Sequence, residues 1–229
     1  MTIGLIIAAI ISPAIFWIFY FRYKDRFSPE PVSIMGGAFM IGFASGHIYL
    51  KFISFLSGVG IPADQSYFIF NGSLVSLVYL IFVVGFFEEL FKLFSFIFIV
   101  KWFRNFDEKI DGIIYSSIVA LGFAAYENFM YLPYLSGAEL IGRAIASPLT
   151  HSVFASIWGH YTGILILNKN KNYKKVLIVF TISFFLHGIY DYLSLSSTLR
   201  ILSSLVILLI WVWRIRVLEI ETKRLMPEL

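Results

Sequence analysis

The sequence predicts an all-α membrane protein that crosses the bilayer about seven times. Of its 229 residues, 59% are apolar and only 14% are charged, whereas soluble domains contain about 25% charged residues. The apolar residues form runs of about twenty, which is the length that a helix needs to cross a bilayer core of about 30 Å. The alternating segments of about ten residues that are typical of a membrane β-barrel are absent.

The whole chain, residues 1–229, is predicted to form one domain in the cell membrane, because no long soluble segment separates the apolar runs. The lipid bilayer is therefore an expected partner. The net charge of +4 does not indicate a nucleic-acid partner, since the basic residues lie in short loops. The absence of cysteine excludes disulfides and thiolate chemistry. No pattern in the sequence specifies the oligomeric state.

The first two predicted spans cover residues 3–21 and 32–56. No basic residue precedes the first span and three follow it between positions 22 and 26, which predicts an anchor with its N-terminus outside, not a cleaved signal peptide. The segment D-R-F-S-P-E-P, from Asp25 to Pro31, ends this helix because proline disfavours helix at and before its position. In the second span, Gly42 and Gly46 form a G-x-x-x-G pair, which is typical of close helix packing.

The third span is predicted over residues 73–100, after a polar stretch at 58–71 that contains no Lys or Arg. It is longer than the bilayer requires, so we expect it to tilt, to kink at Gly85, or to contain two crossings, which would give eight helices. Four further spans are predicted at 111–132, 144–167, 176–195 and 199–218. In this threading fourteen of the 18 Lys and Arg residues lie on one side, which predicts an outside N-terminus and a cytoplasmic C-terminus.

The third span contains the sequence F-E-E-L-F-K, from Phe87 to Lys92. One charged side chain near the bilayer centre costs about 2.5–3.5 kcal/mol on insertion scales, so three in five residues require a compensating role. Glu88 and Lys92 share a helix face and can pair. Glu89 points about 100° away from Glu88, so one glutamate is expected to hold an attacking water while the other positions Lys92 or a histidine.

Ionisable groups in three other predicted spans lie at a similar depth. With a rise of about 1.5 Å per residue, Glu127, His151, His187 and Asp191 all lie about 18–24 Å from the inner face, close to Glu88. Asp191 follows His187 by four residues and could accept a hydrogen bond from one ring nitrogen, which would fix the tautomer. Tyr131 shares a helix face with Glu127. We therefore expect one polar site within the membrane.

These segments, in this order, resemble the PrsW family of intramembrane proteases. The matching pieces are D-R-F-S-P-E-P at 25–31, E-E-L-F-K at 88–92, G-F-A-A-Y-E-N-F-M-Y at 122–131, the span containing His151, and H-G-I-Y-D at 187–191. Tyr126 stands where we expect phenylalanine, which is a conservative change. The resemblance implies hydrolysis of a peptide bond in a single-span membrane protein, through site-one cleavage of a membrane-anchored anti-sigma factor. The family is related to the CAAX-protease enzymes.

Two catalytic arrangements are compatible with the residues. In the first, Glu88 or Glu89 is the general base, His151 and His187 orient the water or stabilise the oxyanion, and Asn128 is a further donor. In the second, His151, His187 and one glutamate, Glu88, hold zinc with an open position for water. The H-E-x-x-H motif that is typical of zinc proteases is not present. The sequence therefore leaves open whether the cofactor is zinc or none.

Two other functions would also use buried polar groups. A proton-coupled transporter would have a relay of such groups across the membrane and inverted repeats, whereas these groups lie in one layer. A non-catalytic chaperone for a partner helix would not require five buried charges. Structural roles are also open, because Glu88 could form only an ion pair with Lys92, and Glu127 could hold a base at a helix contact. His47 and His160 are predicted to be structural.

Overall fold

The computed structural model describes residues 4, 7–61, 74–102, 106–135, 137–168, 172–196 and 198–224, and their regular structure is entirely helical. This confirms the predicted all-α class. The elements are the π-helical η1 (Ile7–Ile11), α2 (Ser12–Lys24), α3 (Val32–Gly58), α5 (Leu74–Tyr79), the π-helical η2 (Leu80–Gly85), α6 (Phe86–Trp102), α7 (Lys109–Tyr131), α8 (Gly137–Leu167), α9 (Tyr173–Leu195) and α10 (Arg200–Arg224).

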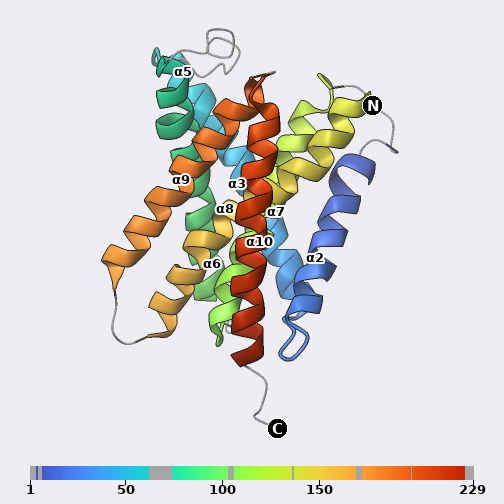
Figure 1. Cartoon of the computed structure of the whole chain (residues 1–229), viewed down its shortest axis with the longest axis vertical. Coiled ribbons are helices and arrows are strands. Elements are labelled where there is room, and N and C mark those ends of the chain that lie inside the picture. Colours follow the sequence, from blue (N-terminus) through green and yellow to red (C-terminus); the bar gives the residue numbers. More distant parts are fainter. Residues whose placement is uncertain are drawn as a thin grey trace.

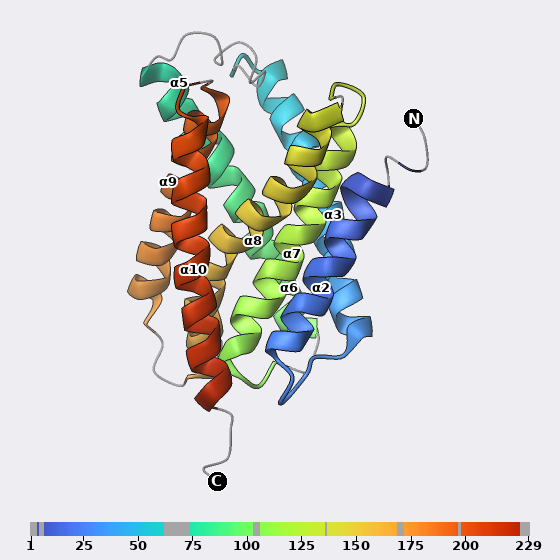
Figure 2. The same ribbon diagram turned by 45° about the vertical axis from the view of Figure 1, so that its right-hand side comes forward.

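The helices form one elongated bundle, in which α2 begins near the top and α10 ends near the bottom (Figures 1 and 2). Helix α7 is its central element, because nearly every residue from Ile110 to Ala125 is buried. It packs most extensively on α8 and α3. The polar groups that the sequence places on α7 and α8 are therefore enclosed by protein.

Five helices of the described chain are long and apolar enough to cross a membrane: α3, the rod Leu74–Trp102, α7, α9 and α10. Helix α2 has only 13 residues, and α8 has polar residues such as Thr150, His151 and Ser152 along its middle. The long third run is one continuous rod formed by α5, η2 and α6, so its described part contains one crossing. The count of seven spans and the orientation of the termini stay predictions.

Two predicted boundaries were wrong. Helix α8 begins at Gly137, so Arg143 lies inside it, not in a loop. Helix α10 continues to Arg224, beyond the predicted end at residue 218, and Arg214 within it is buried. Some predicted features lie outside the described residues. They are the part of the polar stretch from 62 to 71, and three basic residues of the predicted loops: Arg104, Lys169 and Lys171.

Glycines allow the helices around α7 to approach closely. A Cβ atom added at Gly42 would lie 2.0 Å from the Val119 carbonyl oxygen, and one at Gly122 would lie 2.0 Å from that of Phe39. These positions bring α3 and α7 into backbone contact, as the G-x-x-x-G pair predicts.

Helix α9 makes a similar contact with the π-helical segment. A Cβ at Gly85 would lie 2.7 Å from the Phe184 carbonyl oxygen, and one at Gly188 would lie 2.4 Å from Ile81 Cα. The π-helical turns precede α6 directly. This contact places His187 beside the paired glutamates.

Candidate active site

Four helices contribute ionisable side chains to one buried cluster. Its members are Glu88, Glu89 and Lys92 of α6, Glu127 of α7, His151 of α8 and His187 of α9, connected by contacts of 2.7–3.7 Å. The sequence predicted this convergence from depth alone.

Glu89 is the fully enclosed carboxylate of the cluster, with 0% exposure. Its Oε1 accepts a hydrogen bond from the Lys92 ammonium at 2.8 Å and lies 2.9 Å from His187 Nδ1. Its Oε2 accepts from the indole N–H of Trp158 at 2.7 Å. Both oxygens are thus occupied, which makes Glu89 the residue that positions its neighbours.

Glu88 has different surroundings. Its Oε2 is buried without a hydrogen-bond partner among the described residues. This atom lies 3.6 Å from Lys92 Nζ, 3.7 Å from His151 Nδ1 and 3.7 Å from His187 Nε2. Of the two glutamates, Glu88 is therefore the one that can engage a further molecule or ion.

His151 links the α6 groups to α7. Its Nδ1 lies 2.7 Å from Lys92 Nζ and its Nε2 lies 2.9 Å from Glu127 Oε2. An ammonium can only donate, so Nδ1 accepts and Nε2 donates to the carboxylate. Glu127 Oε1 in turn forms an ion pair with Arg143 at 2.7 Å. Glu127 thus contacts both an imidazole of the cluster and a base.

Three other predicted residues lie at the edge of the cluster. The predicted hydrogen bond between His187 and Asp191 is not formed, because Asp191 Oδ2 lies 3.7 Å from His187 Nε2. Glu89 Oε1, 2.9 Å from His187 Nδ1, is the closer partner of this imidazole. Tyr131 lies under the Arg143 guanidinium, 3.9 Å from the ring centroid. Asn128 is 2% exposed and follows Glu127 directly.

Sequence reasoning missed Arg143 and Trp158, although helical spacing carries a signal for both. Arg143 precedes His151 by eight residues and Trp158 follows it by seven, and two helical turns correspond to about seven residues. All three therefore share one face of α8. The residues predicted to be structural have other partners: His47 contacts the Tyr126 hydroxyl at 2.7 Å, and His160 faces Glu221 at 3.4 Å.

A cavity of about 250 Å³ reaches the cluster. Glu88 and Glu127 lie in its wall, together with Tyr49, Leu50, Ile53, Tyr79, Val84, Met130, Tyr131 and Tyr134. These residues belong to the C-terminal ends of α3 and α7 and to the start of the third rod, so the cavity lies toward the end of the bundle where α5 is located (Figure 2).

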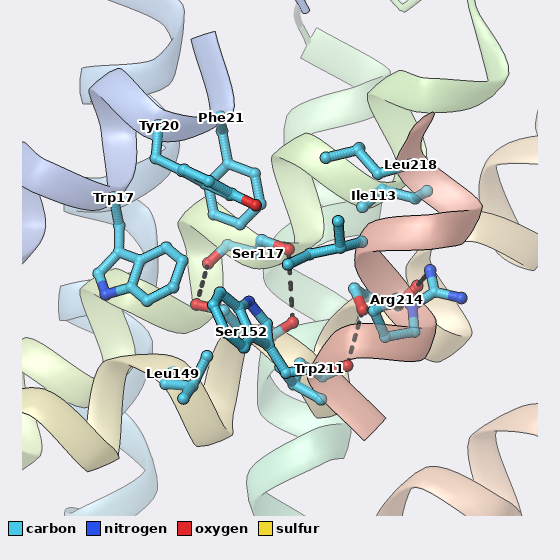
Figure 3. Close-up of a pocket in the computed structure, with 13 residues that line it drawn as sticks. Trp17, Tyr20, Phe21, Ile113, Ser117, Leu149, Ser152, Trp211, Arg214 and Leu218 are labelled. Carbon is cyan, nitrogen blue, oxygen red and sulfur yellow. Dashed lines mark hydrogen bonds between the residues drawn. The ribbon is translucent and has the colours of Figure 1, made fainter. Parts of the chain in front are cut away.

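A second cavity, of about 30 Å³, lies between α2, α7, α8 and α10 (Figure 3). It has room for about one water molecule. Ser117 and Ser152 face each other across it, each hydroxyl donating to the other's carbonyl oxygen at 3.4 Å, and the Arg214 guanidinium donates to Ser156. None of the clustered carboxylates or imidazoles lines it, so it is a packing feature.

Glu88, His151 and His187 also form a group that could hold a metal ion, with one donor atom from each within 4.8 Å of the others. In a tetrahedral zinc site the donors lie about 3.4 Å apart, close to the 3.7 Å from Glu88 Oε2 to each imidazole nitrogen. The buried, unpartnered Oε2 atom supports this fit. These three residues are the ligand set that the sequence predicts.

Comparison with known proteins decides the family. The model of the family described as "PrsW family intramembrane metalloprotease" matches residues 30–215. The chain belongs to the PrsW family. Protease PrsW of Oceanobacillus iheyensis is 32% identical to this chain over 90% of it and 91% of the relative. Protease PrsW of Clostridioides difficile is 32% identical over 96% of this chain and 92% of the relative. Protease PrsW of Bacillus subtilis is 29% identical over 90% of this chain and 91% of the relative. No solved structure matches.

Membership of the PrsW family makes the chain an intramembrane protease of the cell membrane that acts on a membrane protein within the bilayer. The transporter and chaperone alternatives are therefore not favoured. The family is described as a metalloprotease family, in agreement with the buried Glu and His donors.

Proposed function

We propose that this PrsW protein cuts a peptide bond in a single-span membrane protein, with Glu88 as the residue that activates the water. One observation carries this proposal: Glu88 Oε2 lies 3.7 Å from His151 Nδ1 and 3.7 Å from His187 Nε2, and all three atoms are hydrogen-bond acceptors. His187 uses Nδ1 toward Glu89, so its Nε2 presents a lone pair. Lys92 already donates to His151 Nδ1, which leaves Glu88 Oε2 and His187 Nε2 as two acceptors that face each other at 3.7 Å. A water molecule between them supplies two protons.

In this mechanism Glu88 takes a proton from the water as the oxygen attacks the scissile carbonyl carbon. The carbonyl oxygen becomes negative, and the Lys92 ammonium and the Asn128 amide are the donors that we assign to it. Glu88 then gives its proton to the amine as the C–N bond breaks, so the proton balance closes. Glu89 keeps Lys92 and His187 in place throughout.

Glu88, His151 and His187 fit a zinc ion, which would make the water a stronger nucleophile and polarise the carbonyl group. One observation favours the metal-free alternative: Lys92 Nζ already lies 2.7 Å from His151 Nδ1, the nitrogen that zinc would require. Metal content separates the two arrangements. Zinc predicts about one ion per chain and loss of activity in chelator, whereas the metal-free site cleaves after complete removal of zinc.

The substrate proposal depends on the orientation of the bundle. With the N-terminus outside, the end of the cavity marked by Tyr134 faces the outer side, so the cut lies in the outer half of a substrate's membrane segment. We propose a membrane-anchored anti-sigma factor as the substrate, which makes the reaction a site-one cleavage. The tyrosines and Met130 in the cavity wall provide an amphipathic surface for such a segment.

The test is cleavage of a purified single-span anti-sigma factor from the same cell, reconstituted with the enzyme in liposomes. We expect Glu88→Gln, Glu89→Gln and His187→Ala to lose cleavage, and Glu139→Gln, an exposed change in the first turn of α8, to keep it. If the three variants cut as fast as the unsubstituted enzyme, this site is not catalytic.

A further inference from the structure

A second buried cluster of carboxylates lies at the other end of the bundle. Asp25 and Glu30 come from the segment between α2 and α3, and Asp111 comes from the first turn of α7. One oxygen of each lies within 4.8 Å of the others, and their exposures are 1%, 5% and 1%. Asp111 precedes Glu127 on α7 by 16 residues, about 24 Å along the helix. The cluster is therefore separate from the proposed active site.

The protein fixes one oxygen of each carboxylate. Asp25 Oδ2 accepts from the Glu30 N–H at 3.3 Å, and Glu30 Oε2 accepts from the Tyr115 hydroxyl. Asp111 Oδ2 accepts from the N–H groups of Asp107 at 2.9 Å and Glu108 at 2.8 Å. The carboxylates are thus held in place by a helix cap and a turn, without a basic side chain.

Two of the three remaining oxygens are not satisfied. Asp25 Oδ1 and Asp111 Oδ1 are buried without a hydrogen-bond partner in the described part of the chain. The nearby Arg22 guanidinium donates to the Glu30 carbonyl oxygen, not to a carboxylate. Burial and the Glu108 carboxylate raise the pKa of Asp25 to about 7. An unpaired buried charge is strongly destabilising, so this cluster must hold either protons or a cation.

We propose that Asp25, Glu30 and Asp111 bind a hard divalent cation, Mg²⁺ or Ca²⁺. All three donors are carboxylate oxygens, which such cations prefer, whereas zinc sites in proteins use mainly nitrogen and sulfur. The cation would join the α2–α3 connection to the start of α7, the central helix. This inference does not depend on the proposed catalytic mechanism.

The test uses the full chain in lipid nanodiscs, stripped with EDTA and dialysed. Titration with Mg²⁺ or Ca²⁺ should raise Tm in a saturable way, by about 5–10 °C at a hundredfold excess over Kd. Mn²⁺, followed by its electron paramagnetic resonance signal, should bind at about one ion per chain at this site and be displaced by the same titration.

Asp111→Asn and Asp25→Asn should each lose the cation-dependent rise in Tm and the displaceable Mn²⁺. In the absence of cation they should be at least as stable as the stripped protein, since an amide removes a repelling charge. Asp107→Asn is the matched control, because its side chain is exposed and only its N–H contacts Asp111. His187→Ala should keep the rise, which separates this site from the proposed zinc ligands.

A stripped protein whose Tm does not respond to Mg²⁺ or Ca²⁺ would overturn the proposal and leave a proton shared between the carboxylates. An equal response in Asp111→Asn would overturn it too. If both variants fail to fold, Mn²⁺ stoichiometry in the unsubstituted protein and in Asp107→Asn still decides the question, because a value of zero excludes the site.

Discussion

Glu88 and Glu89 are adjacent in sequence, but their surroundings differ, and this difference is the basis of the separate roles that we propose for them. Glu89 satisfies three donors at 2.7–2.9 Å, from Lys92, Trp158 and His187. Glu88 Oε2 faces two imidazoles at 3.7 Å without a hydrogen bond among the described residues. Helical geometry assigns them different directions, and the tertiary partners then leave only Glu88 Oε2 without a hydrogen bond among the described residues.

We predict that the two glutamate-to-glutamine changes differ in their effect on stability. Glu88→Gln should reduce cleavage by at least about 100-fold with the smaller change in Tm, because Glu88 Oε2 lies 3.6 Å from Lys92 Nζ whereas Glu89 Oε1 lies 2.8 Å from it. Glu89→Gln should lose activity and also about 3–5 kcal/mol of stability, because the buried Lys92 ammonium loses its closest anion. Cleavage rate and thermal unfolding, measured on the same preparations, check this, and equal Tm losses would contradict it.

A second prediction concerns the ion pair between Glu127 and Arg143. Since Glu127 also contacts His151, Arg143 should act as a positioning residue for the imidazole. Arg143→Gln, Glu127→Gln and the double variant should show a coupling above about 1 kcal/mol in the cleavage rate, with the loss in kcat larger than the change in KM.

The matched control for this cycle is the pair Lys24–Glu219, which joins α2 to α10 at 3.2 Å. The corresponding glutamine changes should leave cleavage unchanged. Additive losses at Glu127 and Arg143 would show that the pair serves stability alone.

At this scale the sequence predicted the cluster because depth follows from span position and a rise of about 1.5 Å per residue. It paired Lys92 with Glu88, whereas Lys92 Nζ lies closer to Glu89, at 2.8 Å, than to Glu88, at 3.6 Å. The closer partner depends on where Trp158 and His187 lie in space. It missed Arg143 because a predicted helix start at residue 144 excluded it, seven residues after the observed start at Gly137.

At the scale of elements, the position of α7 between α3 and α8 determines how the site is assembled. Gly42 and Gly122 bring α3 against one side of α7, and Gly159 meets Gly112 on the α8 side, where an added Cβ would lie 2.5 Å from the Gly112 carbonyl oxygen. The predicted G-x-x-x-G pair at Gly42 and Gly46 identified the face of α3 that contacts α7. The π-helical segment in the third rod had no such signal, because its hydrogen bonding depends on contact with α9.

We predict that Gly42→Ala destabilises the protein by about 1–3 kcal/mol through overpacking. The added methyl group would lie 2.0 Å from the Val119 carbonyl oxygen, which is backbone and must move with α7. Gly36→Ala on the same helix is the control, because no atom lies within 4 Å of its added Cβ. Thermal unfolding in nanodiscs measures both, and equal stability of the two variants would contradict close packing at Gly42.

At the scale of the whole molecule, the two buried acidic clusters lie toward opposite ends of the bundle. The cavity beside Glu88 and Glu127 lies toward the end with α5, and the Asp25–Glu30–Asp111 group lies at the end where α2 finishes (Figure 1). Helix α7 connects them, since it carries Asp111 in its first turn and Glu127 near its end. In the predicted orientation, the catalytic cavity faces the outside and the cation cluster faces the cytoplasm.

This orientation can be tested directly because the chain contains no cysteine, so each introduced thiol is the only one. Tyr134 is 81% exposed between α7 and α8, and Lys174 is exposed in the first turn of α9 at the opposite end. A membrane-impermeant maleimide added to intact cells should label Tyr134→Cys, and should label Lys174→Cys only after lysis. The cleavage assay on both variants is the control for folding. The predicted orientation is based on the positive-inside rule. The reverse labelling pattern would contradict it and would place the cavity on the cytoplasmic side.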